Sequence, residues 1–248
     1  MTLVAFGYHP VISILQSPYF CLKKVIIQDK YQNDKVLSKW LAEKKVNFQL
    51  LTKGEFERAS FSKKSQGIVA LLHDYDYLPL SRLWQIIPQQ KHPLLVMLDR
   101  VEDPHNFGAI LRTSAAFSVD GIIIASRNQV PVNSTVIKVS AGGIAHVPIC
   151  RVNSLGETVN ELKKRGYKVV AATIPNPLSI SEKIAECHKF QISSPTCLIF
   201  GNEHHGIKKS LLQKSDCCLF IPVNNNVSSL NVATSCGIIL SWLVLSRD

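Results

Sequence analysis

The chain has 248 residues, of which 46% are hydrophobic and 19% are charged, a balance typical of a globular protein. That length suffices for one large hydrophobic core or two smaller ones. No apolar run reaches the roughly 20 residues that span a bilayer, and the first residues, MTLVAFGYHP, lack the pattern of a secretory signal. Seven cysteines without a C-x-x-C pair argue against a disulfide framework or a zinc site. We therefore expect a cytoplasmic protein with no membrane segment and no metal.

The net charge of +10 is densest in the N-terminal third. The first 73 residues hold 11 Lys and Arg against 5 Asp and Glu, with doublets at Lys23-Lys24, Lys44-Lys45 and Lys63-Lys64. A basic bias of this kind favours a polyanionic partner such as a nucleic acid. A solvated, lysine-rich surface explains the same excess equally well, so charge alone does not identify the partner.

Residues 1–73 alternate short helical and extended patterns, which predicts a compact N-terminal α/β domain. Helical patterns cover Pro10 to Gln16 and Asp34 to Lys44, and extended patterns cover Lys24 to Ile27, Val46 to Leu51 and Gly67 to Leu72. Residues 74–93 carry three prolines and a short amphipathic piece, and we interpret them as a linker.

Residues 94–248 contain fully apolar strands separated by helical stretches, which predicts an α/β domain with a mostly parallel, buried sheet. The expected strands are Leu94–Leu98, Gly121–Ala125, Val169–Ala172, Cys197–Phe200 and Cys217–Ile221, and the clearest helices are Ala109–Phe117, Leu155–Arg165 and Leu230–Leu245.

Three loops with unusual polar content follow the carboxyl ends of these strands, where ligands bind in parallel sheets. They are Asp99–Arg112 (DRVEDPHNFGAILR), Gly201–Gly206 (GNEHHG) and Val223–Asn231 (VNNNVSSLN). Neither a G-x-G-x-x-G turn after the first strand nor a G-x-x-x-x-G-K-[ST] loop is present, which disfavours a P-loop enzyme or a nicotinamide-dependent oxidoreductase.

The three loops, in this order, resemble the three motifs of the SpoU/TrmH family of RNA ribose 2′-O-methyltransferases. The first motif is Asp103-Pro104-His105-Asn106-Phe107-Gly108 followed by Arg112, the second is Phe200 to Ile207, and the third is Ile221-Pro222 through Ser228-Ser229-Leu230-Asn231-Val232. Gly7-Tyr8-His9-Pro10-Val11 and Ser65-Gln66-Gly67-Ile68-Val69-Ala70 look like the start and end of the small substrate-binding domain of the RlmB-like branch.

The resemblance implies more about the fold than any periodicity does. It implies a Rossmann-like C-terminal domain with a trefoil knot that holds S-adenosylmethionine, and an N-terminal domain similar to RNA-binding ribosomal proteins. It further implies a homodimer that packs through the knotted domains and combines active-site groups from both chains. The apolar C-terminal helix, with Trp242 and Leu243, is a candidate part of that interface.

By the same resemblance, the adenosine part of the cofactor lies against the backbone of Gly201, Ile221 and Leu230. Five residues are the expected catalytic set: Arg112, Asn106, Glu203, Ser229 and Asn231. Arg112 is expected to hold the target phosphate and to stabilise the developing alkoxide, because a guanidinium with a pKa above about 12 is a poor proton acceptor. Asn106 is expected to orient the substrate or Arg112, and Glu203 to hold Arg112 or the substrate.

The same residues also have possible structural roles that involve no ligand. Ser229 is a candidate N-cap of the last helix, Asn106 is a candidate cap, and Glu203 is a candidate solvated carboxylate. His105, His204 and His205 suggest a metal, but no Cys or acidic partners accompany them. His105 remains a minor alternative as general base.

The leading functional prediction is S-adenosylmethionine-dependent methylation of a ribose 2′-OH, with a guanosine of 23S ribosomal RNA as the expected target. Transfer RNA is the close alternative, although the tRNA-modifying relatives generally lack the N-terminal domain. A binding-only RNA protein that retains the fold is an alternative of a different class.

Overall fold

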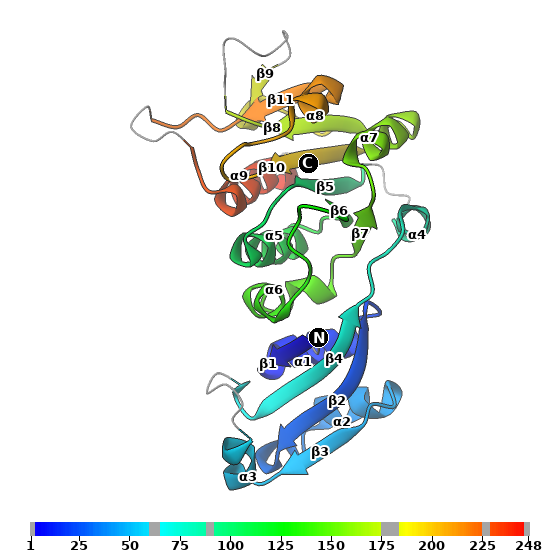
Figure 1. Ribbon diagram of the computed structural model, residues 1–248, viewed down its shortest axis with the longest axis vertical. Helices are drawn as coiled ribbons and strands as arrows, with labels where there is room; N and C mark the ends of the chain where they lie inside the picture. Colours follow the sequence, from blue (N-terminus) through cyan, green and yellow to red (C-terminus); the bar gives the residue numbers. More distant parts are fainter. Residues whose placement is uncertain (1–2, 60–64, 88–91, 175–183, 225–228, 246–248) are drawn as a thin grey trace.

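The computed structural model describes residues 3–59, 65–87, 92–174, 184–224 and 229–245, arranged as two α/β domains stacked along one long axis (Figure 1). The N-terminal domain lies at one end and the C-terminal domain at the other. Lys63, Lys64 and part of the third motif, 225–228, lie outside the described residues.

The N-terminal domain is a four-stranded sheet in the order β1-β4-β2-β3, in which only the β2–β3 pair is parallel. Its elements are β1 (Leu3–Phe6), α1 (Tyr8–Gln16), β2 (Phe20–Gln28), the 3₁₀ helix η1 (Asp29–Tyr31), α2 (Lys35–Glu43), β3 (Phe48–Leu51), α3 (Lys53–Arg58) and β4 (Ile68–Tyr75). The predicted α/β character is confirmed. Strand β1 and helix α3 were not anticipated, because four and six residues are too few for a clear period.

The C-terminal domain is built on a seven-stranded parallel sheet in the order β7-β6-β5-β10-β8-β11-β9. The strands are β5 (Leu94–Asp99), β6 (Gly121–Ala125), β7 (Ile149–Val152), β8 (Lys168–Ala172), β9 (Ile184–Glu186), β10 (Thr196–Gly201) and β11 (Cys217–Phe220). The five expected strands and the mostly parallel sheet are confirmed, while β7 and β9 were missed. β7 is four residues long and mixes Arg151 into its apolar run, so its sequence carries little strand signal.

Helices cover both faces of this sheet (Figure 1). One face carries α5 (Pro104–Ala116), α6 (Ser134–Val139), the 3₁₀ helix η3 (Gly143–Ala145) and α9 (Val232–Leu245), and its core includes Phe107 and Phe200. The other face carries α4 (Leu80–Ile86), α7 (Leu155–Lys164) and α8 (Lys209–Lys214), and a separate core there includes Met97 and Ile199. The 3₁₀ helix η4 (Cys187–Lys189) packs beside α9.

The segment predicted to be a linker is folded over most of its described length. Strand β4 continues to Tyr75, Leu78 forms a parallel bridge to Cys150, and α4 buries Leu83 completely. The buried Tyr75 hydroxyl also accepts the Ile149 N–H at 3.2 Å. Pro79 sits directly before α4 and does not interrupt it, and most of the short amphipathic piece expected in this segment lies within that helix.

The two domains also meet away from this segment. The Val4 N–H donates to the Ser134 hydroxyl at 2.9 Å, which joins β1 to α6. A Cβ at Gly142 would lie 2.9 Å from Ser13 Oγ, so α1 packs directly against the turn before η3. One of the apolar cores, which includes Leu3 and Phe107, runs through both domains. These contacts fix the N-terminal domain against the helices of the C-terminal one.

Candidate functional site

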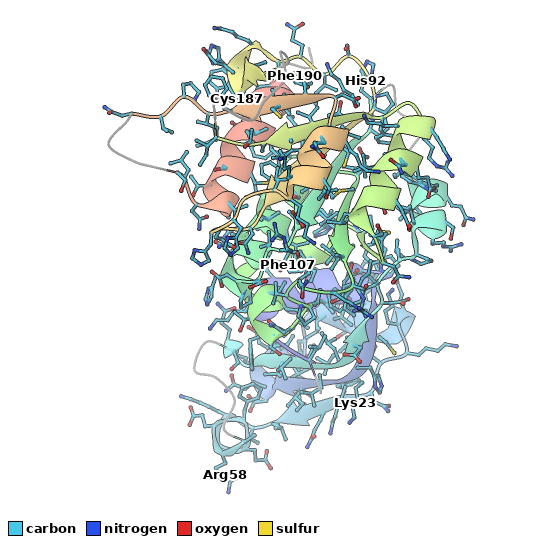
Figure 2. The ribbon with its side chains drawn as sticks, turned by 45° about the horizontal axis from the view of Figure 1, so that its top comes forward. Lys23, Arg58, His92, Phe107, Cys187 and Phe190 are labelled. Carbon is cyan, nitrogen blue, oxygen red and sulfur yellow. The ribbon has the colours of Figure 1, made fainter. Side chains whose placement is uncertain are left out.

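The first motif joins β5 to α5 at the carboxyl edge of the sheet. Asp103 caps the helix by accepting the His105 N–H at 2.9 Å, and Pro104 occupies the first helical turn, where its missing N–H is harmless. The helix therefore begins five residues earlier than the expected Ala109. Phe107, labelled in Figure 2, is fully buried among the core side chains, which fixes the rotation of α5 about its axis.

The second motif follows β10 and closes a tight loop on itself. A Cβ at Gly201 would lie 2.3 Å from both the Gly206 carbonyl carbon and the Ile207 nitrogen, so only glycine permits this backbone approach. Gly206 has a φ of 63°, in the left-handed region. The buried Asn202 side chain accepts the N–H groups of His204 and His205 at 2.9 and 3.0 Å. Backbone packing thus shapes the whole loop.

The first and second motifs are locked together by polar contacts beneath the site. The buried Asp99 carboxylate accepts the Lys208 N–H at 2.7 Å and pairs with Arg100 at 3.2 Å. Asn202, in the second motif, donates a hydrogen bond from its side chain to the Arg100 carbonyl of the first loop at 2.8 Å. These residues were not singled out from the sequence, because the contacts of Asp99 with Lys208 and of Asn202 with Arg100 join segments 109 and 102 residues apart.

The third motif ends in the N-cap of α9, and that cap is Asn231. Its Oδ1 accepts the N–H groups of Ala233 and Thr234 at 2.9 and 3.3 Å. The interpretation of Ser229 as the cap is therefore wrong, and the helix starts at Val232 instead of Leu230. A serine two residues before the real cap cannot reach the first free N–H groups of the helix.

Three predicted site residues from the three motifs form one hydrogen-bonded chain, which we call the amide relay: Asn231, Asn106 and Glu203. The Asn231 Nδ2 donates to Asn106 Oδ1 at 2.8 Å, and the Asn106 Nδ2 donates to Glu203 Oε1 at 2.8 Å. A carboxylate only accepts, so Glu203 fixes which way the Asn106 amide points, and Asn106 in turn fixes Asn231. The order of donors runs from the cap of α9 to Glu203.

A cavity of about 420 Å³ opens beside this relay, within the range typical of small-molecule sites. It is lined by Gly201, Glu203, Ile221, Ser229 and Leu230, all predicted site residues, together with apolar side chains that include Phe200, Leu219 and Ile239. Glu203 is the acidic side chain among the described lining residues. Apolar side chains form much of the remaining wall, and polar side chains are added by Thr173, Asn202, His204, His205, Ser229 and Ser235. A largely apolar wall with one carboxylate suits a flat heteroaromatic group that carries positive charge.

Arg112 is the one predicted site residue that neither lines the cavity nor joins the amide relay. It lies on α5, six residues after Asn106, which places it about 120° around the helix axis and about 9 Å along it. Its side chain is exposed and makes no hydrogen bond or ion pair within the part of the chain that the structure describes. It does not line the cavity, and Glu203 contacts Asn106 in its place.

The histidines are near the site without forming a metal centre. His204 and His205 line the cavity rim with ring centroids 6.4 Å apart, and His105 is exposed at the start of α5. Among the described residues, no group of three or more His, Cys, Asp or Glu side chains is arranged to hold a metal. In the same residues, no helix is long and apolar enough to cross a membrane.

Comparison with known proteins fits this geometry. Residues 93–241 match the model of the SpoU rRNA Methylase family, and residues 4–78 match the model for RNA 2′-O ribose methyltransferase substrate binding. The chain is 39% identical over 201 residues to the "Uncharacterized tRNA/rRNA methyltransferase MG252" of Mycoplasma genitalium, covering 80% of this chain and 81% of that protein. This chain belongs to the SpoU rRNA methylase family. The family prediction made from the three motifs is confirmed.

Further relatives cover nearly the whole of this SpoU methylase. A "Putative TrmH family tRNA/rRNA methyltransferase" of Staphylococcus haemolyticus is 33% identical over 245 residues, covering 96% of this chain and 93% of that protein. The crystal structure of the SpoU methyltransferase AviRb from Streptomyces viridochromogenes, in complex with AdoMet, superposes with a TM-score of 0.78 at 21% identity, covering 98% and 90% of the two chains. The likeness to AviRb confirms the fold class; the knot stays a prediction from the family.

Proposed function

We propose that this SpoU methylase transfers a methyl group from S-adenosylmethionine to the ribose 2′-OH of a nucleotide in 23S ribosomal RNA, with guanosine as the expected base. The observation that carries the proposal is the amide relay, which joins all three motifs beside one cavity at the carboxyl edge of a parallel sheet. Family membership supports the reaction class, and the AdoMet complex of AviRb supports the cofactor.

The residues of the cavity fit S-adenosylmethionine. Backbone at Gly201, Ile221 and Leu230 offers hydrogen-bonding groups for an adenine edge, and the apolar wall offers surface for its ring. The Glu203 carboxylate favours a ligand that carries positive charge. No basic side chain is required there, because this cofactor has no phosphate. When bound, the cofactor supplies an electrophilic methyl group on a sulfonium.

The chain contributes positioning and electrostatic stabilisation to the transfer. The relay holds Glu203 and Asn106 in fixed orientations, which lowers the entropy lost when the ribose is placed in line with the methyl group. Arg112 holds the target phosphate by two parallel N–H donors and stabilises the negative charge that develops on O2′. The proton of the 2′-hydroxyl leaves to a general base, a role for which His105 is a minor alternative because histidine is the usual base near neutral pH.

We further propose that the active enzyme is a homodimer in which Arg112 serves the cavity of the partner chain. The exposed position of Arg112, away from the cavity of its own chain, supports this arrangement. Trp242 and Leu245 on α9 are 49% and 75% exposed, and they are the proposed contact surface. Leu243, which the sequence also placed at this interface, is fully buried in the core of its own chain, so that part of the expectation is wrong.

The presence of the N-terminal domain, whose family model describes substrate binding, favours ribosomal RNA because the tRNA-modifying relatives generally lack this domain. The test is methylation of total RNA by the purified protein with isotope-labelled S-adenosylmethionine, followed by mapping of ribose-methylated positions. Label in 23S RNA supports the proposal, and label confined to tRNA supports the close alternative. No incorporation into any RNA, with cofactor binding retained, would favour the binding-only alternative.

A further inference from the structure

The N-terminal domain carries a half-exposed aromatic and basic group at the start of α1, which we call the tyrosine cluster: Tyr8, Lys30, Tyr31 and Gln66. The rings of Tyr8 and Tyr31 stack with centroids 5.5 Å apart and an interplanar angle of 24°. The Lys30 ammonium lies 4.9 Å from the centroid of the Tyr31 ring. Stacked aromatics beside a lysine are the elements that bind single-stranded nucleotides.

The two rings are held in place by their hydroxyls. Tyr31 donates to the Gln66 carbonyl at 3.0 Å, and Tyr8 donates to Asp34 Oδ1 at 3.2 Å. Asp34 also caps α2 through the Leu37 N–H, so its carboxylate is already engaged. Burial and the Asp34 carboxylate raise the pKa of Tyr8 above its ordinary value. The cluster is thus preorganised, which reduces the entropy lost on binding.

Gln66 has a backbone conformation that a side chain rarely adopts. Its φ is 55°, in the left-handed region, and Gly67 follows with a φ of 85°. The Oε1 of Gln66 accepts the Tyr8 N–H at 3.3 Å, while its Nε2 has no hydrogen bond within the described residues and its side chain is exposed. A free amide donor on a strained residue beside stacked rings suggests a ligand contact.

Close backbone contacts connect the tyrosine cluster to Arg112. A Cβ at Gly143 would lie 2.8 Å from Arg112 Cα, and a Cβ at Gly142 would lie 3.8 Å from Pro10 Cα, in the same first turn of α1 as Tyr8. The start of α1 is therefore separated from the helix of Arg112 by a single glycine turn. RNA that places a phosphate at Arg112 needs only a short stretch of chain to reach the cluster.

We propose that the tyrosine cluster binds an unpaired nucleotide of the RNA substrate, which stacks on the Tyr8–Tyr31 pair while Lys30 contacts its phosphate and Gln66 Nε2 its base or sugar edge. This inference rests on the proposed function for RNA as the substrate. It assigns to the N-terminal domain a stacking site distinct from the methyl-transfer cavity.

The test measures RNA binding without turnover, so that it remains informative if methyl transfer fails. Fluorescence anisotropy is recorded for the full chain with four labelled 12-nucleotide homopolymers at low salt. Loss of one stacked base weakens binding by about tenfold or more, which is the expected effect of Tyr31→Leu on the tightest of the four. Lys30→Ala removes a phosphate contact and is expected to weaken binding at low salt and to make it less dependent on salt. Tyr31→Phe retains the ring but loses its hydrogen bond to the Gln66 carbonyl, so it is expected to weaken binding less than Tyr31→Leu.

Lys39→Ala is the matched control, because Lys39 lies 5.5 Å from the ring of Trp40 on α2, outside the cluster. It removes the same charge and the same kind of cation–π contact, and we expect it to leave binding within about twofold. If Tyr31→Leu fails to fold, the proposal is tested by Lys30→Ala, because Lys30 is exposed and its replacement should not disturb folding. Equal losses in Lys39→Ala and Lys30→Ala, unchanged binding in both cluster variants, or no binding by the unchanged protein would overturn the proposal.

Discussion

The two faces of helix α5 differ in what they contact, although the residues concerned are six positions apart. The inner face carries Asn106, which is almost fully buried and hydrogen-bonded on both sides to Glu203 and Asn231. The outer face carries Arg112, which is exposed and has no polar partner in the described part of the chain. One helix thus separates a residue that organises the cavity from one that is free to meet a second molecule. Substitutions on the two faces should therefore affect turnover and cofactor affinity differently.

The largest effect is expected from Arg112→Lys on the outer face. Lysine keeps the charge but loses the planar pair of donors, so turnover should fall by about 100-fold or more. Cofactor affinity, measured by calorimetry, should stay unchanged because Arg112 does not line the cavity of its own chain. Arg165→Lys, at an exposed pair with Glu161 on α7, is the control. Near-normal turnover in Arg112→Lys would contradict the proposed role of Arg112 in holding the phosphate and stabilising the charge on O2′.

Gly201→Ala should damage the inner face by a different route. The added Cβ would stand 2.3 Å from backbone atoms of Gly206 and Ile207, so the loop must move. A displacement of about 1 Å at such a site reduces rates by about 100-fold, and here cofactor affinity should fall as well. Gly54→Ala, where a Cβ would meet nothing within 4 Å, should leave affinity unchanged. Tight cofactor binding by Gly201→Ala would contradict the close approach.

Asn106→Asp tests the polarity of the relay. The new carboxylate would face Glu203 as a second acceptor, which should lower turnover by about 10- to 100-fold at pH 8. Because like charges raise the pKa of one carboxyl, lowering the pH should reprotonate the pair and recover part of the activity. A pH–rate profile that falls in parallel with the unchanged enzyme would argue against the relay. Asn160→Asp, beside Lys214 on the surface, is the control.

The smallest effect on turnover is expected at Asn231, which both caps α9 and donates to Asn106. Asn231→Asp keeps an oxygen to cap α9 but cannot donate to Asn106, so stability should hold while turnover drops by about tenfold. Asn231→Ala loses both contacts and should also cost about 1 kcal/mol of unfolding free energy. Thermal unfolding and turnover measured on both variants separate the tasks. Equal stability of the two would mean that the cap contributes nothing.

The sequence predicted the elements of the catalytic domain well because they are long or fully apolar. The uninterrupted apolar runs that start at Leu94, Gly121 and Cys197 each predict a buried strand, whereas β7 gives no such signal because Arg151 interrupts it. The sequence of residues 74–93 did not indicate that this segment packs against the C-terminal domain. Proline marks local chain geometry, whereas the burial of Leu83 depends on a surface supplied by residues distant in sequence.

For the candidate site, the sequence determined which residues belong together: the motifs identified the family, and seven of the eight predicted residues either line the cavity or join the amide relay. Tertiary structure alone decided how they are connected. Glu203 contacts Asn106 instead of Arg112, and Asn231 instead of Ser229 caps α9. The physical reason is that motif composition records which chemical groups are present. The direction of a hydrogen bond between segments 97 or 125 residues apart depends on how the sheet and helices place them.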